Sequence, residues 1–274
     1  MDPSSRWRTE DAPLSMDDHR LQTRWLRNLE AEASAPTLVF LHEGLGSIAQ
    51  WKDFPEHLAR RLGLSAFLYE RRGYGRSSPA LEPRRMDYLE REACEALPDV
   101  LSRAGIERPI LVGHSDGGTI ALLFAARFPS LPVAMIVEAP HVFLEPITLQ
   151  GLRQATEAYE HGRLKARLTR FHGAQTEAVF RGWNETWLHP DARHWNVTAQ
   201  LHGLRAPLLL IQGEDDAYGS EAQLRAIAAQ AQGHTEQWMI PHCGHAPHLE
   251  AQDAVLARVT AFLESAKRPR NPTS

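Results

Sequence analysis

A serine stands in a glycine-rich run, where Gly113, Ser115 and Gly117 form the pattern Gly-x-Ser-x-Gly. The apolar run 109–112 precedes it, and apolar residues with helical spacing follow from about Thr119. A serine on a sharp strand-to-helix turn presents its hydroxyl from a strained backbone, and only glycine fits beside it. The pattern is short enough to arise by chance. The strand before it and the helix after it nevertheless favour Ser115 as a nucleophile over a serine in an ordinary glycine-rich turn.

A serine hydroxyl is a poor nucleophile until a base takes its proton, so this hypothesis requires a histidine and a carboxylate that orients it. With a turn of this kind the acid and then the histidine follow the serine along the chain. The buried-strand pattern 208–212 ends in a loop with Glu214, Asp215 and Asp216. We select Asp216 as the acid, and either neighbour replaces it if the register of the loop differs by one residue.

The histidine is expected in the loop after a second strand that ends at Ile240. Gly244 precedes His245 there, and a glycine lets the loop approach the serine closely. We therefore predict His245 as the general base. His242 and His248 are interpreted as histidines of the surface or of the surroundings of the site.

Short apolar runs alternate with amphipathic segments, which is typical of strands and helices in a parallel sheet. Helices are predicted at 120–128 and 254–263, and at 88–102 with a kink or break at Pro98. Between 141 and 205 the alternation fails, and we interpret that segment as a helical insertion between core regions 1–140 and 206–274. The predicted strands are Thr37–Leu41, Ala66–Glu70, Pro109–Val112, Val133–Val137, Leu208–Gln212 and Gln237–Ile240.

These motifs, in this order and spacing, resemble the α/β-hydrolase superfamily from Leu21 to about Leu263. The resemblance implies a mostly parallel central sheet flanked by helices, with a helical lid inserted before the strand that carries the acid. It implies Ser115, Asp216 and His245 as the catalytic triad. It also implies that 69–77 is the family's glycine-containing loop, here with a glutamate where the family usually has aspartate, and a structural part of the fold.

The oxyanion of an acyl-transfer intermediate needs backbone N–H donors, which contribute ~3 to 4 kcal/mol each. One predicted donor is the amide of Asp116. The resemblance implies Gly44, in the loop 42–46, as the other. Glu43 occupies a position that is usually glycine in the family, which leaves its own amide as the alternative donor.

The side chain of Asp116 has two interpretations. A carboxylate in the first turn of a helix is stabilised by the helix dipole, and we favour this structural role. The same Asp-Gly-Gly sequence resembles the valacyclovir-hydrolase-like branch, which implies recognition of a substrate amino group. If Asp116 and Glu43 both face the pocket, a neutral or amine-bearing substrate is expected to be preferred over an anionic one.

Composition limits the classes of partner. The 274 residues are 43% hydrophobic and carry a formal net charge of −4, without a basic run that could bind nucleic acid or an anionic membrane. No stretch of about 18 apolar residues and no secretory signal is visible, so a cytoplasmic protein is expected. Two cysteines are too few for a disulfide framework or a thiolate metal site, and no metal or cofactor is predicted. A homo-oligomer is left open.

The expected ligand is a small molecule, bound under the lid by Glu43, Phe143, Trp183 and Trp187. A serine nucleophile disfavours the alkyl-enzyme chemistry of dehalogenases and epoxide hydrolases, which use aspartate. The leading hypothesis is hydrolysis of a carboxylic ester, thioester or lactone through an acyl-serine. The alternatives are carbon–carbon bond hydrolysis, as in the meta-cleavage-product hydrolases, and a non-catalytic ligand receptor on the same fold.

Overall fold

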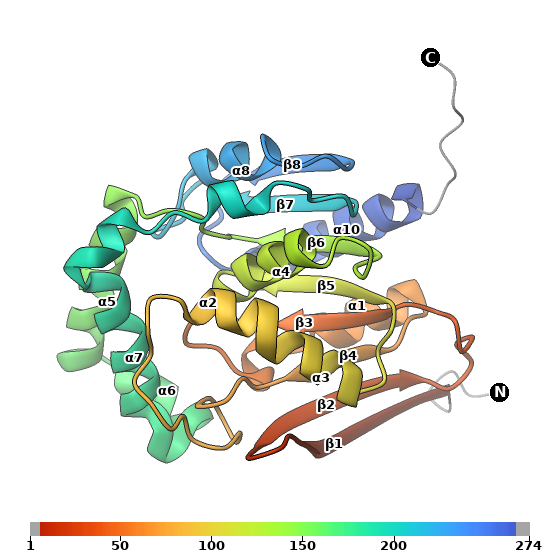
Figure 1. Cartoon of the computed structure of the whole chain (residues 1–274), viewed down its shortest axis with the longest axis horizontal. Helices are drawn as coiled ribbons and strands as arrows, with labels where there is room; N and C mark the ends of the chain where they lie inside the picture. Colours follow the sequence, from red (N-terminus) through yellow and green to blue (C-terminus); the bar gives the residue numbers. More distant parts are fainter. Residues whose placement is uncertain (1–5, 267–274) are drawn as a thin grey trace.

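An eight-stranded sheet runs through the computed structural model, which describes residues 6–266 (Figure 1). Its strands lie in the order β1-β2-β4-β3-β5-β6-β7-β8; the six strands from β4 to β8 are parallel to one another, and β2 is antiparallel to both β1 and β4. The predicted sheet, mostly parallel and flanked by helices, is confirmed. The strands are β1 (Trp7–Ser15), β2 (Arg20–Asn28), β3 (Thr37–Leu41), β4 (Ala66–Tyr69), β5 (Pro109–His114), β6 (Ala134–Glu138), β7 (Leu208–Gly213) and β8 (Thr235–Ile240).

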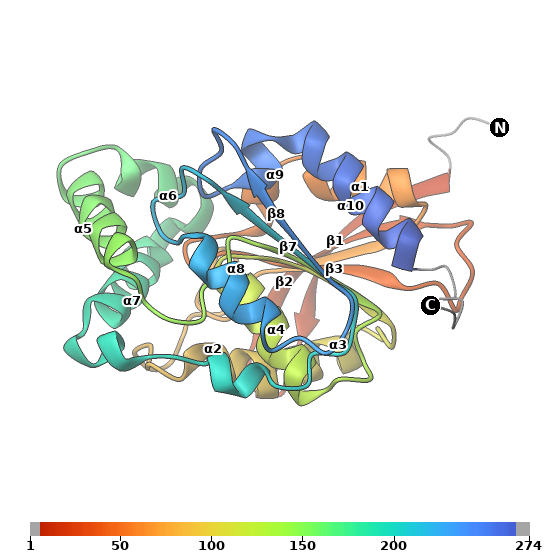
Figure 2. The same ribbon diagram turned by 90° about the horizontal axis from the view of Figure 1, so that it is seen from above.

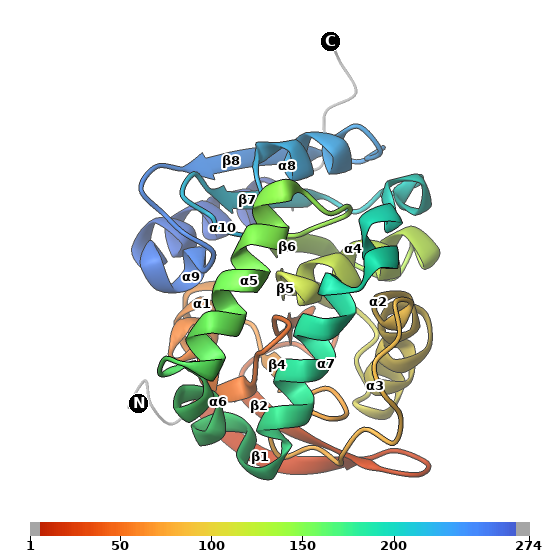
Figure 3. The same ribbon diagram turned by 90° about the vertical axis from the view of Figure 1, so that its left-hand side faces the viewer.

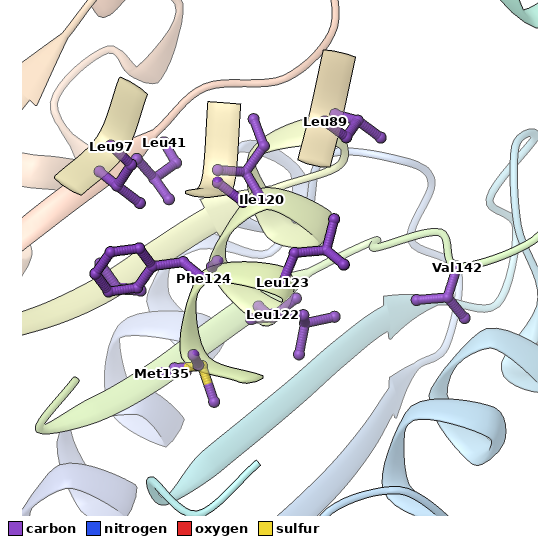
Figure 4. Packing of buried hydrophobic residues seen from close by; sticks show 14 of the residues in the cluster. Leu41, Leu89, Leu97, Ile120, Leu122, Leu123, Phe124, Met135 and Val142 are labelled. Atoms are coloured by element: carbon purple, nitrogen blue, oxygen red, sulfur yellow. The ribbon is translucent and has the colours of Figure 1, made fainter. Parts of the chain in front are cut away.

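Successive side chains of a strand point to opposite faces of the sheet, and helices cover both faces, so each central strand is buried on both sides. In β3, Val39 and Leu41 belong to one buried cluster, and Leu38 and Phe40 belong to the other. Figure 2 shows helices on both faces, with α1, α9 and α10 on one side and α2, α3, α4 and α8 on the other. In Figure 4 the side chains of α4 pack against those of α3 and the sheet. This double coverage makes the strands continuous apolar runs in the sequence.

The helices agree with the sequence prediction where their apolar spacing was clear. The predicted helix 88–102 is continuous but contains a π-helical turn, Glu92–Ala96, directly before the segment with Pro98. Such a turn fits a residue without an N–H into a helix. The helices are α1 (Phe54–Leu62), α2 (Tyr88–Arg91), α3 (Leu97–Arg103), α4 (Asp116–Arg127), α5 (Pro146–Glu160), α6 (Leu164–His172), α7 (Thr176–Leu188), α8 (Glu221–Ala228), α9 (Pro247–Glu250) and α10 (Gln252–Ala266).

Strands β1 and β2 were not predicted. They form an antiparallel hairpin at the edge of the sheet, and most of β1 is exposed. Charged side chains, in place of buried apolar ones, connect the two strands. Arg24 donates two hydrogen bonds, of 2.6 and 2.7 Å, to Asp11, its partner in the register. Polar edge strands lack the apolar runs by which the central strands were found.

The segment between β6 and β7 is helical, as expected. It contains α5, α6, α7 and three short 3₁₀ helices, Gly173–Gln175, Pro190–His194 and Thr198–Leu201. In Figure 1 the helices α5, α6 and α7 lie at the left end of the sheet, and Figure 3 shows α5 and α7 crossing in front of the strand ends. Whether this segment acts as a lid stays a prediction. The division of the chain into regions 1–140, 141–205 and 206–274 also stays a prediction, and residues 1–5 and 267–274 of these regions lie outside the described residues. No helix within residues 6–266 is both long and apolar enough to cross a bilayer.

Candidate active site

Ser115 lies on the sharp turn between β5 and α4. Its backbone has φ 53° and ψ −117°, a conformation that costs a non-glycine residue about 1–3 kcal/mol. The turn is tight, since a Cβ on Gly117 would overlap the carbonyl of Leu41. The amide of Ser115 donates to the carbonyl of Glu138 at 2.9 Å, which holds the turn against β6. The glycine pattern is thus explained by close backbone packing around a strained serine.

Asp216 and His245 are in direct contact. Nδ1 of His245 lies 2.8 Å from each carboxylate oxygen of Asp216. The carboxylate also accepts hydrogen bonds from the amide of Tyr218 at 2.8 Å and from the side chain of Gln212 at 2.5 Å, so it is held in place independently of the histidine. Glu214 and Asp215 are exposed, whereas Asp216 is buried. Of the three acids in this loop, the structure therefore brings Asp216 to the histidine.

The electrostatic surroundings of His245 favour its protonated form. Burial, the largest single influence, lowers the pKa of this histidine. The Asp216 carboxylate and smaller contributions from Glu43 and Asp116 together outweigh it, so the net pKa is raised above the ordinary value. The ring of His114 donates from Nε2 to the carbonyl of His245 at 2.7 Å, which ties this loop to the residue beside Ser115. The ring of Tyr218 lies 4.7 Å from that of His245. His245 is thus fixed from three sides.

Ser115 and His245 line the same cavity. Because Nδ1 of His245 is engaged with Asp216, Nε2 is the nitrogen left to accept a proton. Within residues 6–266 the Ser115 hydroxyl makes no hydrogen bond to the protein. Such contacts are often loose in an unliganded site and tighten when substrate binds.

Gly44 lies close to the side chain of Asp116, the residue of the other predicted oxyanion donor. A Cβ built on Gly44 would be 3.1 Å from Oδ2 of Asp116, and it would overlap the indole of Trp183. Only glycine therefore fits at this point. Among the described residues, neither the amide of Gly44 nor that of Asp116 has a hydrogen-bond acceptor. Neither residue is among the described residues that line the cavity, so their role as oxyanion donors stays a prediction.

Arg71 binds backbone carbonyls of the loop that contains Gly44. Its buried guanidinium donates from Nη1 to the carbonyl of His42 at 2.5 Å and from Nη2 to the carbonyl of Glu43 at 2.9 Å. Tyr74 donates its hydroxyl to the carbonyl of Gly44 at 3.1 Å. In a trans peptide the N–H points away from the C=O, so contacts on these carbonyls direct the amides of the loop to the opposite side. Sequence reasoning missed Arg71 because its loop, 69–77, was interpreted only as part of the scaffold.

Glu43 lines the cavity but bonds its own loop. Its carboxylate accepts from the amide of Leu45 at 2.6 Å and from the side chain of Gln50 at 3.4 Å. Burial raises its pKa, and the Leu45 hydrogen bond opposes that effect. Glu43 thus lines the cavity and stabilises its own loop at the same time.

The side chain of Asp116 is fully buried. Tyr88 donates its hydroxyl to Oδ2 at 2.5 Å, and Nε2 of His141 lies 3.6 Å from Oδ1. Burial and the neighbouring Asp116 carboxylate raise the pKa of Tyr88, so its hydroxyl stays protonated and able to donate. This environment favours the structural interpretation of the Asp116 carboxylate over contact with a substrate amine.

The cavity has a volume of about 260 Å³. Trp183 and Trp187 line it, as expected, and Trp187 also donates from Nε1 to the hydroxyl of Tyr88 at 3.0 Å. The expectation for Phe143 was wrong: it is not among the described residues that line the cavity. Its backbone forms a bridge with Asn196 and binds Gln223, which holds the residue to one side. The lining residues that sequence reasoning missed include Leu45, Ser47, Gln50, Trp51, His114, His141, Leu144, Thr148, Leu152, Arg167, Tyr218, His248 and Leu249. They are scattered along the chain, and no local motif marks them.

Comparisons with known proteins agree with this fold. A family model described as "Alpha/beta hydrolase family" matches residues 38–258. A 2-hydroxy-6-oxononadienedioate/2-hydroxy-6-oxononatrienedioate hydrolase of Comamonas testosteroni is 23% identical over 265 residues, which cover 86% of this chain and 90% of that protein. The human serine hydrolase BPHL is 26% identical over 203 residues, or 72% of this chain and 68% of the human protein.

A solved structure has a similar fold. The 2-hydroxy-6-oxo-6-phenylhexa-2,4-dienoate hydrolase from Rhodococcus sp. strain RHA1 superposes with a TM-score of 0.75 at 15% identity. The match covers 94% of this chain and 99% of that one. At this identity the likeness supports the fold and not the substrate.

Proposed function

Because the chain belongs to the alpha/beta hydrolase family, we propose that it is a serine hydrolase that cleaves a carboxylic ester, thioester or lactone. The observation that carries the proposal is the convergence of a strained serine and an Asp216–His245 pair on one cavity. A buried carboxylate that holds the Nδ1 proton of a histidine leaves the other ring nitrogen to act as a base. This is the arrangement that a serine nucleophile requires.

The proposed reaction proceeds in two halves. Ser115 Oγ attacks the acyl carbon while Nε2 of His245 takes the hydroxyl proton, and the amides of Gly44 and Asp116 bind the oxyanion. The bond to the leaving group then breaks, and His245 returns the proton to the departing alcohol or thiol. Water, activated by the same histidine, cleaves the acyl-serine and releases the acid. Asp216 stays ionised throughout and stabilises the imidazolium.

The cavity supports a small substrate with an apolar or aromatic part. Ligand sites typically measure ≈ 300–1,000 Å³, and the cavity volume of about 260 Å³ lies just below this range. Leu144, Leu152, Trp183 and Trp187 supply an apolar wall. A compact acyl group or leaving group fits this wall best.

Carbon–carbon bond hydrolysis is the second candidate. It is favoured by the name of the Comamonas relative, a hydrolase of 2-hydroxy-6-oxo dienedioates and trienedioates. The same serine, acid and histidine would serve that reaction. The buried carboxylate of Asp116 and the acid Glu43 beside the donors make a dianionic substrate the less favourable choice here.

A fluorophosphonate probe and a substrate panel test the proposal. We expect covalent labelling of Ser115 and turnover of at least one class among small esters, thioesters and lactones. Turnover of a vinylogous diketone with no ester turnover would select the second candidate. Neither labelling nor turnover of any substrate would contradict both and leave a ligand receptor.

The pH dependence should report the raised pKa of His245. Only the neutral imidazole accepts the serine proton, so kcat/KM is expected to fall as the pH drops through that pKa. The Asp216 carboxylate is the main influence that raises the pKa, so in Asp216→Asn the inflection should move to lower pH. Profiles of kcat/KM on one ester, for wild type and variant, measure this. An inflection that stays in place would show that another group titrates.

Arg71→Lys should slow the chemical step more than it weakens binding. Lysine keeps the charge but cannot hold the carbonyls of His42 and Glu43 together, so the Gly44 amide loses its direction. Complete loss of one oxyanion donor costs ≈ 10²–10³ in kcat, and we expect a partial effect of about 10- to 100-fold with KM nearly unchanged. Steady-state kinetics on the best ester give both constants.

The matched control is Arg76→Lys, the same substitution at an exposed position of the same loop. Its kcat should stay near that of the wild type. A rise in KM at constant kcat in Arg71→Lys would contradict the assigned role, because it would show a loss of substrate binding in place of oxyanion stabilisation.

A further inference from the structure

Part of the cavity wall carries hydrogen-bond acceptors that lack donors. Gln50 donates its Nε2 to Glu43, which fixes the orientation of the amide, and its Oε1 is buried without a partner among the described residues. The hydroxyl of Ser47, a residue that is 1% exposed, also lacks a partner there. All three residues line the cavity that contains Ser115. Buried polar atoms without partners cost about 1–3 kcal/mol each, so such a cluster is typical of a site whose partner is a ligand.

A second carboxylate–histidine pair, Glu138 and His248, lies beside the same cavity, and its histidine lines the cavity. Oε2 of Glu138 accepts from the backbone amide of His248 at 3.2 Å and lies 2.8 Å from its Nδ1. An ionised carboxylate can only accept, so the contact with Glu138 assigns the ring proton to Nδ1. In the neutral ring Nε2 is then an acceptor. His248 lies against Trp51, with ring centroids 4.5 Å apart, and lines the cavity.

We propose that Glu43, Gln50 and His248 form an acceptor wall that binds an uncharged hydrogen-bond donor of the substrate, a hydroxyl or an amide N–H. The inference rests on the proposed function and specifies its substrate class. A hydroxyl satisfies Oε1 of Gln50 or Nε2 of His248, and the two N–H groups of a primary amide can satisfy both, whereas a carbonyl or ether oxygen would leave both unpaired. The apolar residues near Trp183 would hold the remainder of the molecule.

Charge argues against an anion on this wall. Glu43 contributes a carboxylate, and Glu138 lies buried behind His248. Arg167, an exposed residue of α6, also lines the cavity and is the feature that would favour an anion. The experiment must therefore separate a neutral donor from a carboxylate.

Binding to Ser115→Ala protein, measured by isothermal titration calorimetry at pH 8, tests the inference without turnover. The ligands are ethyl esters of ω-hydroxy acids of graded chain length, each matched by its ω-methoxy ether and its ω-carboxylate. Primary amides and their N,N-dimethyl analogues form a second arm. The protein variants are His248→Phe and Gln50→Leu, with His57→Phe as a control at an exposed histidine of α1.

At the chain length that fits, we expect the hydroxyl or primary-amide ligand to bind at least about 10-fold more tightly than its methylated partner, a difference of ~1.4 kcal/mol. The preference should disappear in His248→Phe, shrink in Gln50→Leu and survive in His57→Phe. The arm with the larger preference identifies the donor. Equal affinities throughout, no binding of any donor ligand, a preference that survives in His248→Phe and Gln50→Leu, or tighter binding of the carboxylate would overturn the inference. Failure of the proposed function is recognised separately, as absence of ester turnover by the wild-type protein.

Discussion

Ser115→Ala should lower kcat for the best ester by ~10³-fold or more and abolish fluorophosphonate labelling. Alanine keeps the size and the strained backbone of the turn but lacks the atom that bonds to the acyl group. The Asp216–His245 pair and the oxyanion amides remain, so substrate binding should be largely preserved. The covalent route is removed, and only slow direct attack by water is left.

Two measurements separate loss of the nucleophile from loss of structure. The thermal midpoint of Ser115→Ala should stay near that of the wild type, because the hydroxyl has no hydrogen-bond partner among residues 6–266. Ser102→Ala, at an exposed serine of α3, should keep both activity and labelling. If Ser115→Ala retained activity near the wild-type level, the assignment of the nucleophile would be wrong.

Asp216→Asn should lower kcat by ~10² to 10⁴-fold. The carboxylate accepts the Nδ1 proton of His245, which leaves Nε2 as the base facing the serine side. An amide NH₂ in its place favours the opposite tautomer and cannot stabilise the imidazolium. His245 would then hold its proton on the wrong nitrogen.

Asp215→Asn is the matched control, because it makes the same change at the exposed neighbour. Its effect should be mild. The amide of Tyr218 and the side chain of Gln212 both donate to the Asp216 carboxylate. The NH₂ group of an asparagine there would face one of these donors, which lowers the stability of the fold by about 1–3 kcal/mol. The assay therefore needs a temperature at which the thermal midpoint of Asp216→Asn shows that it is folded. The reverse ranking of the two variants would make Asp215 the acid.

Local sequence was sufficient to predict the central strands and the sharp turn that carries Ser115. Strand β3 was predicted with its observed bounds, Thr37–Leu41, because a strand buried on both faces must be apolar throughout. Gly113 and Gly117 mark the turn because a Cβ at either position would strike backbone. These features are constraints within one segment of chain, so one segment suffices to reveal them.

The edge hairpin and the wall of the cavity depended on tertiary structure. Strands β1 and β2 are polar because one face is in water, and their pairing places Arg24 opposite Asp11 across the turn. Phe143 was expected to line the cavity because of its residue type and position, but a bridge between its backbone and Asn196 holds it away from the cavity. No local sequence pattern indicates which side chains of a loop face the cavity.

The sequence by itself determined which residues have the chemistry, and the tertiary structure decided which of them meet. Asp215 and Asp216 are the same residue type one position apart, and only the fold buries one of them against His245. Glu138 and His248 are 110 positions apart, and their contact forms because the end of β6 lies beneath the histidine loop. A contact of that kind depends on the positions of two distant backbones, which are set by the packing of the whole sheet and not by either local sequence.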